Sequence, residues 1–94
     1  MKAAKIDANQ NEIVKALRKA GYSVQILSAV GKGCPDLAVG IRGKTVLVEL
    51  KDGTKIPSKQ ALTYDQLLWH KNWKGAAIVA FSFDDAISKL NDLT

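Results

Sequence analysis

Two acidic residues and a lysine interrupt an otherwise apolar part of the chain, GKGCPDLAVGIRGKTVLVELK. They are Asp36, Glu49 and Lys51, and the apolar runs around them predict two strands joined by a tight turn. A two-residue turn at Arg42 and Gly43 would place Asp36 directly opposite Glu49, with Cβ atoms about 5 Å apart and Lys51 on the same face. A three-residue turn would break this pairing, so the register is itself a prediction.

The predicted pairing favours a bound cation. Two carboxylates this close repel each other and destabilise a bare hairpin. A hard cation such as Mg²⁺ prefers oxygen ligands and is bound by one or two carboxylates with waters and substrate phosphate. Lys51 could then help to deprotonate a metal-bound water or stabilise charge on a phosphate oxygen. The alternative is structural: Glu49 and Lys51 form a solvated ion pair, and Asp36 caps a loop.

Helix caps and apolar runs predict the elements that must position these residues. Asp7, with Gln10 as its capping-box partner, opens a first helix that Gly21 ends, and a second capping box joins Thr63 to Gln66. The expected elements are a helix over Gln10–Ala20, strands within Tyr22–Val30, Asp36–Ile41 and Lys44–Lys51, a loop over Asp52–Ser58, a helix from Thr63 to between Asn72 and Gly75, a strand over Ala76–Phe81 and a helix opening at Ser82. The last strand is continuously apolar, which predicts burial on both of its faces. The order α-β-β-β-α-β-α indicates an α/β fold, a mixed sheet flanked by helices.

Composition narrows the class of protein. The 94 residues fit one domain, residues 1–94, and their net charge of +5 suits a polyanionic partner such as nucleic acid. The single cysteine, Cys34, excludes an internal disulfide and indicates a reducing compartment. No apolar run reaches the roughly 20 residues of a membrane span, and the N-terminus lacks the apolar stretch of a signal peptide. These features predict a soluble intracellular protein with no membrane partner.

The segment AVGIRGKT ends like a phosphate-binding P-loop but does not predict a nucleotide site. Ala38 stands where the first glycine should be, and strand residues follow Thr45 in place of the required helix. No nucleotide cofactor is therefore expected.

Four motifs together resemble the PD-(D/E)XK nucleases, and within them the virus-type replication-repair nuclease (VRR-NUC) family. That family's pattern has a glutamate in the first helix, a G-x-P-D-L strand, V-E-x-K, and a helix with L-S/T-x-x-Q-x-x-W-H. The matching parts of this chain are Glu12, GCPDL, VELK and LTYDQLLWH, in the same order, and the resemblance covers roughly Gln10 to Leu90.

The resemblance implies a restriction-endonuclease-like core and a Mg²⁺- or Mn²⁺-dependent DNA endonuclease. It implies these site residues: Asp36, Glu49, the Leu50 carbonyl and Glu12 at the metal, Lys51 as catalytic lysine, and Gln66 near the site. Stand-alone phage members resemble junction resolvases that act as homodimers on branched DNA, whereas the domain of the Fanconi-associated nuclease acts as a monomer on flaps. The chain carries only the catalytic core, so the phage-like type is the better match, which implies a DNA-repair enzyme in the cytoplasm of a bacterial host.

Several of these residues also have simpler explanations. Without the resemblance, Glu12 would be a solvated first-turn acid that favours the helix dipole. Gln66 already serves Thr63 as a capping partner, and the two functions compete for one side chain. His70 shares the helical face of Gln66, but a lone histidine near a helix end more often caps carbonyls, so it is left out of the catalytic set. Cys34 is expected to be a small, partly buried filler.

Basic and aromatic residues suggest how DNA is contacted. Lys32, Lys55 and Lys59 lie in loops beside the hairpin and as a group predict a DNA-facing rim, although each alone fits plain surface charge. Trp69 and Trp73 more often pack in a core or a dimer interface than stack on bases. A non-catalytic nucleic-acid-binding module, a flap or duplex nuclease, and RNA cleavage remain alternatives.

Overall fold

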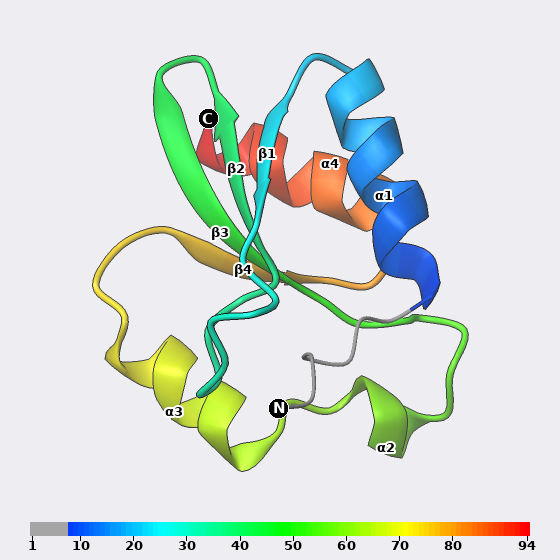
Figure 1. Ribbon diagram of the computed structural model, residues 1–94, viewed down its shortest axis with the longest axis vertical. Helices are drawn as coiled ribbons and strands as arrows, with labels where there is room; N and C mark the ends of the chain where they lie inside the picture. Colours follow the sequence, from blue (N-terminus) through cyan, green and yellow to red (C-terminus); the bar gives the residue numbers. More distant parts are fainter. Residues whose placement is uncertain (1–7) are drawn as a thin grey trace.

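The helices and strands follow one another in the predicted order, with one short helix added. The computed structural model describes residues 8–94. The elements are α1 (Ala8–Lys19), β1 (Ser23–Ile26), β2 (Leu37–Ile41), β3 (Lys44–Leu50), α2 (Pro57–Gln60), α3 (Tyr64–Asn72), β4 (Ala77–Ala80) and α4 (Phe83–Leu93) (Figure 1). The added helix is α2, which begins at a proline in a segment expected to be a loop or its continuation.

The predicted caps account for most of the helix ends. Gly21 has a φ of 98° and ends α1, while the N–H of Tyr22 donates to the Leu17 carbonyl at 3.0 Å. The Thr63 capping box opens α3, and the Ser82 hydroxyl accepts from the Asp85 N–H at the start of α4. The predicted N-cap Asp7 lies outside the described residues.

The four strands form one mixed sheet in the order β1-β2-β3-β4. The first two pairings are antiparallel and β3 pairs with β4 in parallel. The parallel pair requires a long crossover, which α2 and α3 supply. This confirms an α/β fold with a mixed sheet.

The turn between β2 and β3 sets the register as predicted. Arg42 and Gly43 both have positive φ, 50° and 76°, which is the conformation of the two-residue turns that match strand twist. The ladder runs from Ile41 opposite Lys44 to Leu37 opposite Val48. The ladder ends there, and one further step in the same register would bring Asp36 opposite Glu49.

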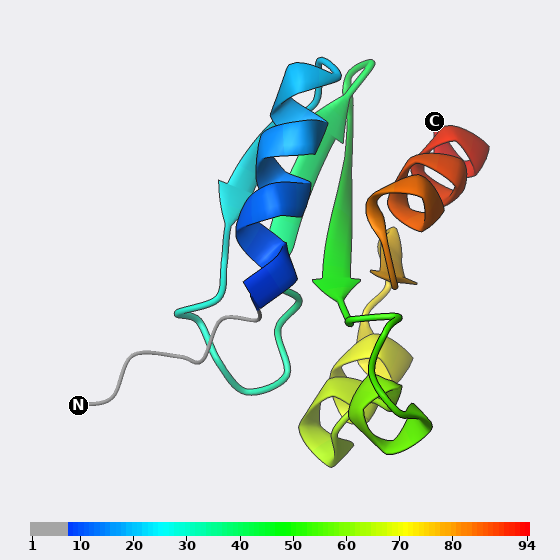
Figure 2. The same cartoon turned by 90° about the vertical axis from the view of Figure 1, so that its right-hand side faces the viewer.

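Two helices cover one face of the sheet. The buried cluster joins residues of α1 and α4 to alternate residues of the central strands: Ile13, Val14, Leu17, Tyr22, Leu37, Val39, Val46, Val48, Leu50, Ala80, Ala86 and Leu90. Figure 2 shows α1 and α4 on this side of the sheet. The residues between them in the strands, such as Ala38 and Leu47, point to the other face and are only half-buried. No helix in residues 8–94 has the length and apolar character needed to cross a membrane.

The prediction that β4 is buried on both faces was wrong. β4 is the edge strand next to β3, and only Ala80 of its four residues is fully buried. Ile78 packs partly against the helices, and Val79 on the other face remains half-buried. A continuous apolar run therefore belongs to an edge strand here, which has a neighbouring strand on one side only and is half-buried at three of its four residues.

Candidate active site

Asp36 and Glu49 lie at the end of the hairpin remote from its turn. The Asp36 carboxylate accepts a hydrogen bond from the Leu50 N–H at 2.8 Å, which ties the start of β2 to the end of β3. The Asp36 carbonyl also accepts from the Leu27 N–H at 2.7 Å, across to the chain leaving β1. Asp36 is therefore held from both sides at the position that the register predicts.

Glu49 and Lys51 are buried, which excludes the solvated ion pair considered from the sequence. Glu49 is 2% exposed and Lys51 is 9% exposed. Both belong to the face of β3 opposite the helices, because Val48 and Leu50 alternate with them into the core. Charged side chains are rarely buried unless they are paired, since desolvation costs several kcal/mol for an isolated charge. Burying these two charged side chains therefore lowers the stability of the fold compared with apolar residues at the same positions.

The Gln66 side chain bridges these two charges. Its Oε1 accepts from Lys51 Nζ at 2.8 Å, and its Nε2 donates to Glu49 Oε2 at 3.2 Å. The same Oε1 accepts from the Thr63 N–H at 2.9 Å as part of the capping box. The expected competition between capping and site functions does not exist, because one amide serves both. The start of α3 is thereby fixed to the end of β3.

Gly33 lets the loop before β2 lie directly on α3. Its φ is 82°, and a Cβ added there would come within 2.3 Å of the Asp65 carbonyl oxygen. No other residue type fits without moving this backbone, which leads directly into Gln66. The loop that delivers Asp36 and the helix that delivers Gln66 are thus packed against each other.

Glu12 is not brought to these residues. It is exposed on α1, whereas the inward stripe of that helix consists of Gln10, Ile13, Val14 and Leu17. Within residues 8–94, no third His, Cys, Asp or Glu joins the two carboxylates to form a metal-binding cluster. A role for Glu12 at the metal stays a prediction.

Gln10 is a polar residue of α1 that was predicted from the sequence only as a capping-box partner. It is 2% exposed, and its Nε2 donates to Ser28 Oγ at 3.1 Å, so α1 is anchored to the loop between β1 and β2. Its spacing indicates this buried position, because Gln10 precedes Ile13 by three residues and Leu17 by seven and so lies on the inward stripe of the helix.

By chemical type, the predicted donor set would suit a hard divalent cation. The Leu50 N–H donates to the Asp36 carboxylate at the start of β2. Because the N–H and C=O of one strand residue point to the same side, we expect the Leu50 carbonyl to face that way as well. Two carboxylates and one carbonyl are oxygen donors of the kind that Mg²⁺ and Mn²⁺ accept, with waters completing the shell. Burial, and then the negative charges of Glu49 and Asp36, raise the pKa of the half-buried Cys34 thiol. The Cys34 thiol is therefore protonated at neutral pH.

The three predicted DNA-binding lysines are all exposed. Lys32 lies in the loop before β2, Lys55 in the segment after β3, and Lys59 on α2. Figures 1 and 2 both place this loop, α2 and α3 at the end of the sheet where β3 finishes. The lysines are therefore at the same end of the molecule as Asp36 and Glu49.

His70 does not show the carbonyl cap expected from its position. Its Nε2 is buried and, within the described residues, has no hydrogen-bond partner, while its ring meets Trp69 edge-on at 5.2 Å. Burial lowers the pKa of His70, so the imidazole is neutral at neutral pH. It stays outside the catalytic set.

Comparison of the chain with protein-family models, curated proteins and solved structures found no match.

Proposed function

We propose that the chain is a metal-dependent DNA endonuclease of the PD-(D/E)XK type, in the VRR-NUC family, which hydrolyses phosphodiester bonds in branched DNA such as four-way junctions. The observation that supports this most is the Gln66 bridge between buried Glu49 and buried Lys51, beside an Asp36 held by the Leu50 N–H. A plain hydrophobic core would be at least as stable without these charges. The α/β order with a mixed sheet is also compatible with a restriction-endonuclease-like core.

Each residue of the site has a distinct part in the proposed reaction. A bound Mg²⁺ or Mn²⁺ would supply a Lewis acid at the scissile phosphate. Asp36, Glu49 and the Leu50 carbonyl would hold that ion. The Lys51 ammonium, oriented by Gln66, would donate a hydrogen bond to a phosphate oxygen as negative charge develops there. The exposed Lys32, Lys55 and Lys59 would contact backbone phosphates and position the DNA without reading its sequence.

A panel of labelled DNAs tests this proposal. Four-way junctions, flaps, nicked duplexes and linear duplexes are incubated with the protein and Mg²⁺, then Mn²⁺. We expect cleavage of at least one branched DNA. Asp36→Asn and Lys51→Ala should each lower the rate by about 10²–10³-fold or more, because the first removes a ligand of the metal ion and the second removes the cation that faces the reacting phosphate. Asp92→Asn, an exposed carboxylate on α4, is the matched control and should cut normally.

Two results would contradict the proposal. Binding of DNA without cleavage in either metal, undiminished by Asp36→Asn, would indicate a non-catalytic nucleic-acid-binding module. Cleavage by Lys51→Ala at the parent rate would show that the site is assigned to the wrong residues. The fold of each variant is checked by circular dichroism and thermal melting.

A further inference from the structure

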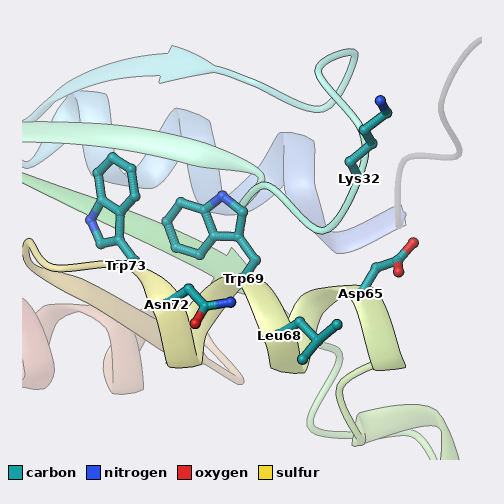
Figure 3. Close-up of a pocket in the computed structure, with 6 residues that line it drawn as sticks. All are labelled: Lys32, Asp65, Leu68, Trp69, Asn72 and Trp73. Atoms are coloured by element: carbon teal, nitrogen blue, oxygen red, sulfur yellow. The ribbon is translucent and has the colours of Figure 1, made fainter.

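A pocket of about 310 Å³ lies against α3, next to the candidate active site. It is lined by Lys32, Asp65, Leu68, Trp69, Asn72 and Trp73. Figure 3 shows Lys32 and Asp65 at one end of this pocket and Trp73 at the other, with Trp69 between them. Its volume is at the lower end of the range of small-ligand pockets, about 300–1,000 Å³.

Two stacked indole rings form the main apolar surface of the pocket. Trp69 and Trp73 have ring centroids 4.7 Å apart and an angle of 17° between their planes. Trp73 is 46% exposed, and α3 has no fully buried residue. Packing in the core, one of the two functions expected for these tryptophans, is therefore not what Trp73 does. The exposed part of the Trp73 ring is an aromatic surface on which a planar ligand could stack.

The helix connects this aromatic surface to the candidate active site. Trp69 follows Gln66 by three residues, so the two share one face of α3, and Trp73, the C-cap residue of that helix, stacks on Trp69. Gln66 is bonded to Glu49 and Lys51. On the other side, Gly33 packs on the Asp65 backbone, in the loop that carries both Lys32 and Asp36. A ligand in the pocket would therefore lie beside the segments that present the carboxylates.

The polar groups of the pocket suit a nucleotide. Lys32 offers a cation to a phosphate, and the Asn72 amide offers both a donor and an acceptor to the edge of a base. Asp65 can accept from an exocyclic amino group. Aromatic rings on which bases stack are one of the features by which proteins bind single strands without sequence preference.

We propose that this pocket is a stacking site for one unpaired nucleobase of the DNA substrate, close to the phosphate that is cut. The inference rests on the proposed nuclease function and adds a basis for its substrate choice. Bases at a junction or flap are unpaired or easily unpaired, so stacking on Trp73 would favour branched DNA over intact duplex. Stacking tolerates every base, so the preference would be for structure and not for sequence.

A second copy of the chain fits this pocket less well. Lys32, Lys71 and Lys74 are all exposed on or beside it, whereas lysine is depleted in the cores of protein interfaces.

The test measures binding without cleavage, in the Asp36→Asn protein with EDTA. The chain has two tryptophans and both line this pocket, so tryptophan fluorescence reports on the pocket alone. The probes are a short oligothymidylate and a hairpin duplex with the same number of phosphates. We expect the oligothymidylate to quench the fluorescence. Adding Trp73→Ala should weaken its binding by about tenfold, as loss of one stacked base would, and leave duplex affinity within about twofold.

Two further variants separate stacking from charge and from misfolding. Trp73→Phe keeps an aromatic face and should retain most of the single-strand affinity. Lys74→Ala removes an exposed charge next to Trp73 but outside the pocket lining, and should weaken both probes equally.

Three outcomes would overturn the inference: no quenching by the oligothymidylate, equal losses on both probes in Trp73→Ala, or unchanged affinity together with a dimer that Trp73→Ala converts to a monomer. The last would make the pocket a contact between copies. Because no cleavage is measured, none of these outcomes decides whether the chain is a nuclease.

Discussion

The candidate active site depends most on one residue that carries no charge. Gln66 holds the Lys51 ammonium and the Glu49 carboxylate with the two ends of its amide, and the same oxygen closes the capping box of α3. The geometry of the two charged groups is therefore tied to the position of a helix start. Gln66 is a positioning residue in this account, since its contacts are with the charged residues and not with the reacting phosphate.

Replacing Gln66 by alanine should separate its two functions when it is compared with Thr63→Ala. Both changes weaken the capping box, so each should lower the free energy of unfolding by about 0.5–2 kcal/mol. Only Gln66→Ala also releases Lys51 and Glu49, so we expect it alone to lower cleavage by about 10–100-fold, as loss of an outer-shell partner does. Urea unfolding and single-turnover cleavage measure the two effects. Equal cleavage by the two variants would mean that Gln66 acts only as a cap.

At the scale of elements, the site is made by packing the loop before β2 onto the start of α3. Gly33 permits this contact, and Gly31 provides a matched control. Both have positive φ, 82° and 76°, but a Cβ at Gly31 would meet nothing within 4 Å.

Gly31→Ala should therefore lower the free energy of unfolding by about 1–2 kcal/mol, because alanine disfavours the left-handed backbone conformation. Gly33→Ala should cost more, because the Asp65 backbone must also move, and it should reduce cleavage because Gln66 moves with it. Urea unfolding of both variants, followed by the cleavage assay, checks this. If the two alanines cost the same stability and leave activity equal, the loop and α3 are not coupled as described.

The features that could be predicted from the sequence are those set by residues close together in the chain, such as turns and helix caps. The turn at Arg42 and Gly43 fixed the hairpin register, and the Thr63 box fixed the start of α3. The short helix α2 was missed because it has four residues and no side-chain cap. The burial of β4 was overestimated, because an apolar run does not reveal whether its strand lies at the edge of the sheet. Gln10 was assigned to a local cap, and its partner Ser28 lies in a loop that only the tertiary fold brings near.

At the scale of the whole molecule, the candidate site residues and the segments that carry the exposed lysines lie at one end of the sheet. A four-way junction is resolved by two symmetric cuts, whereas one chain supplies one site, so we propose a homodimer. Light scattering at working concentrations, with the junction assay run in parallel, should give the mass of two chains. A monomer with full junction cleavage would contradict the dimer and favour a flap nuclease that acts as a single chain.

The central claim is that Asp36 and Glu49 hold one divalent cation between neighbouring strands. Calorimetric titration with Mn²⁺ in the absence of DNA tests it most directly, on the parent, Asp36→Asn, and the control Asp92→Asn, which removes the same charge from the exposed end of α4. We expect one Mn²⁺ site per chain in the parent and the control, and no measurable binding in Asp36→Asn. Equal Mn²⁺ affinity in all three proteins would contradict it.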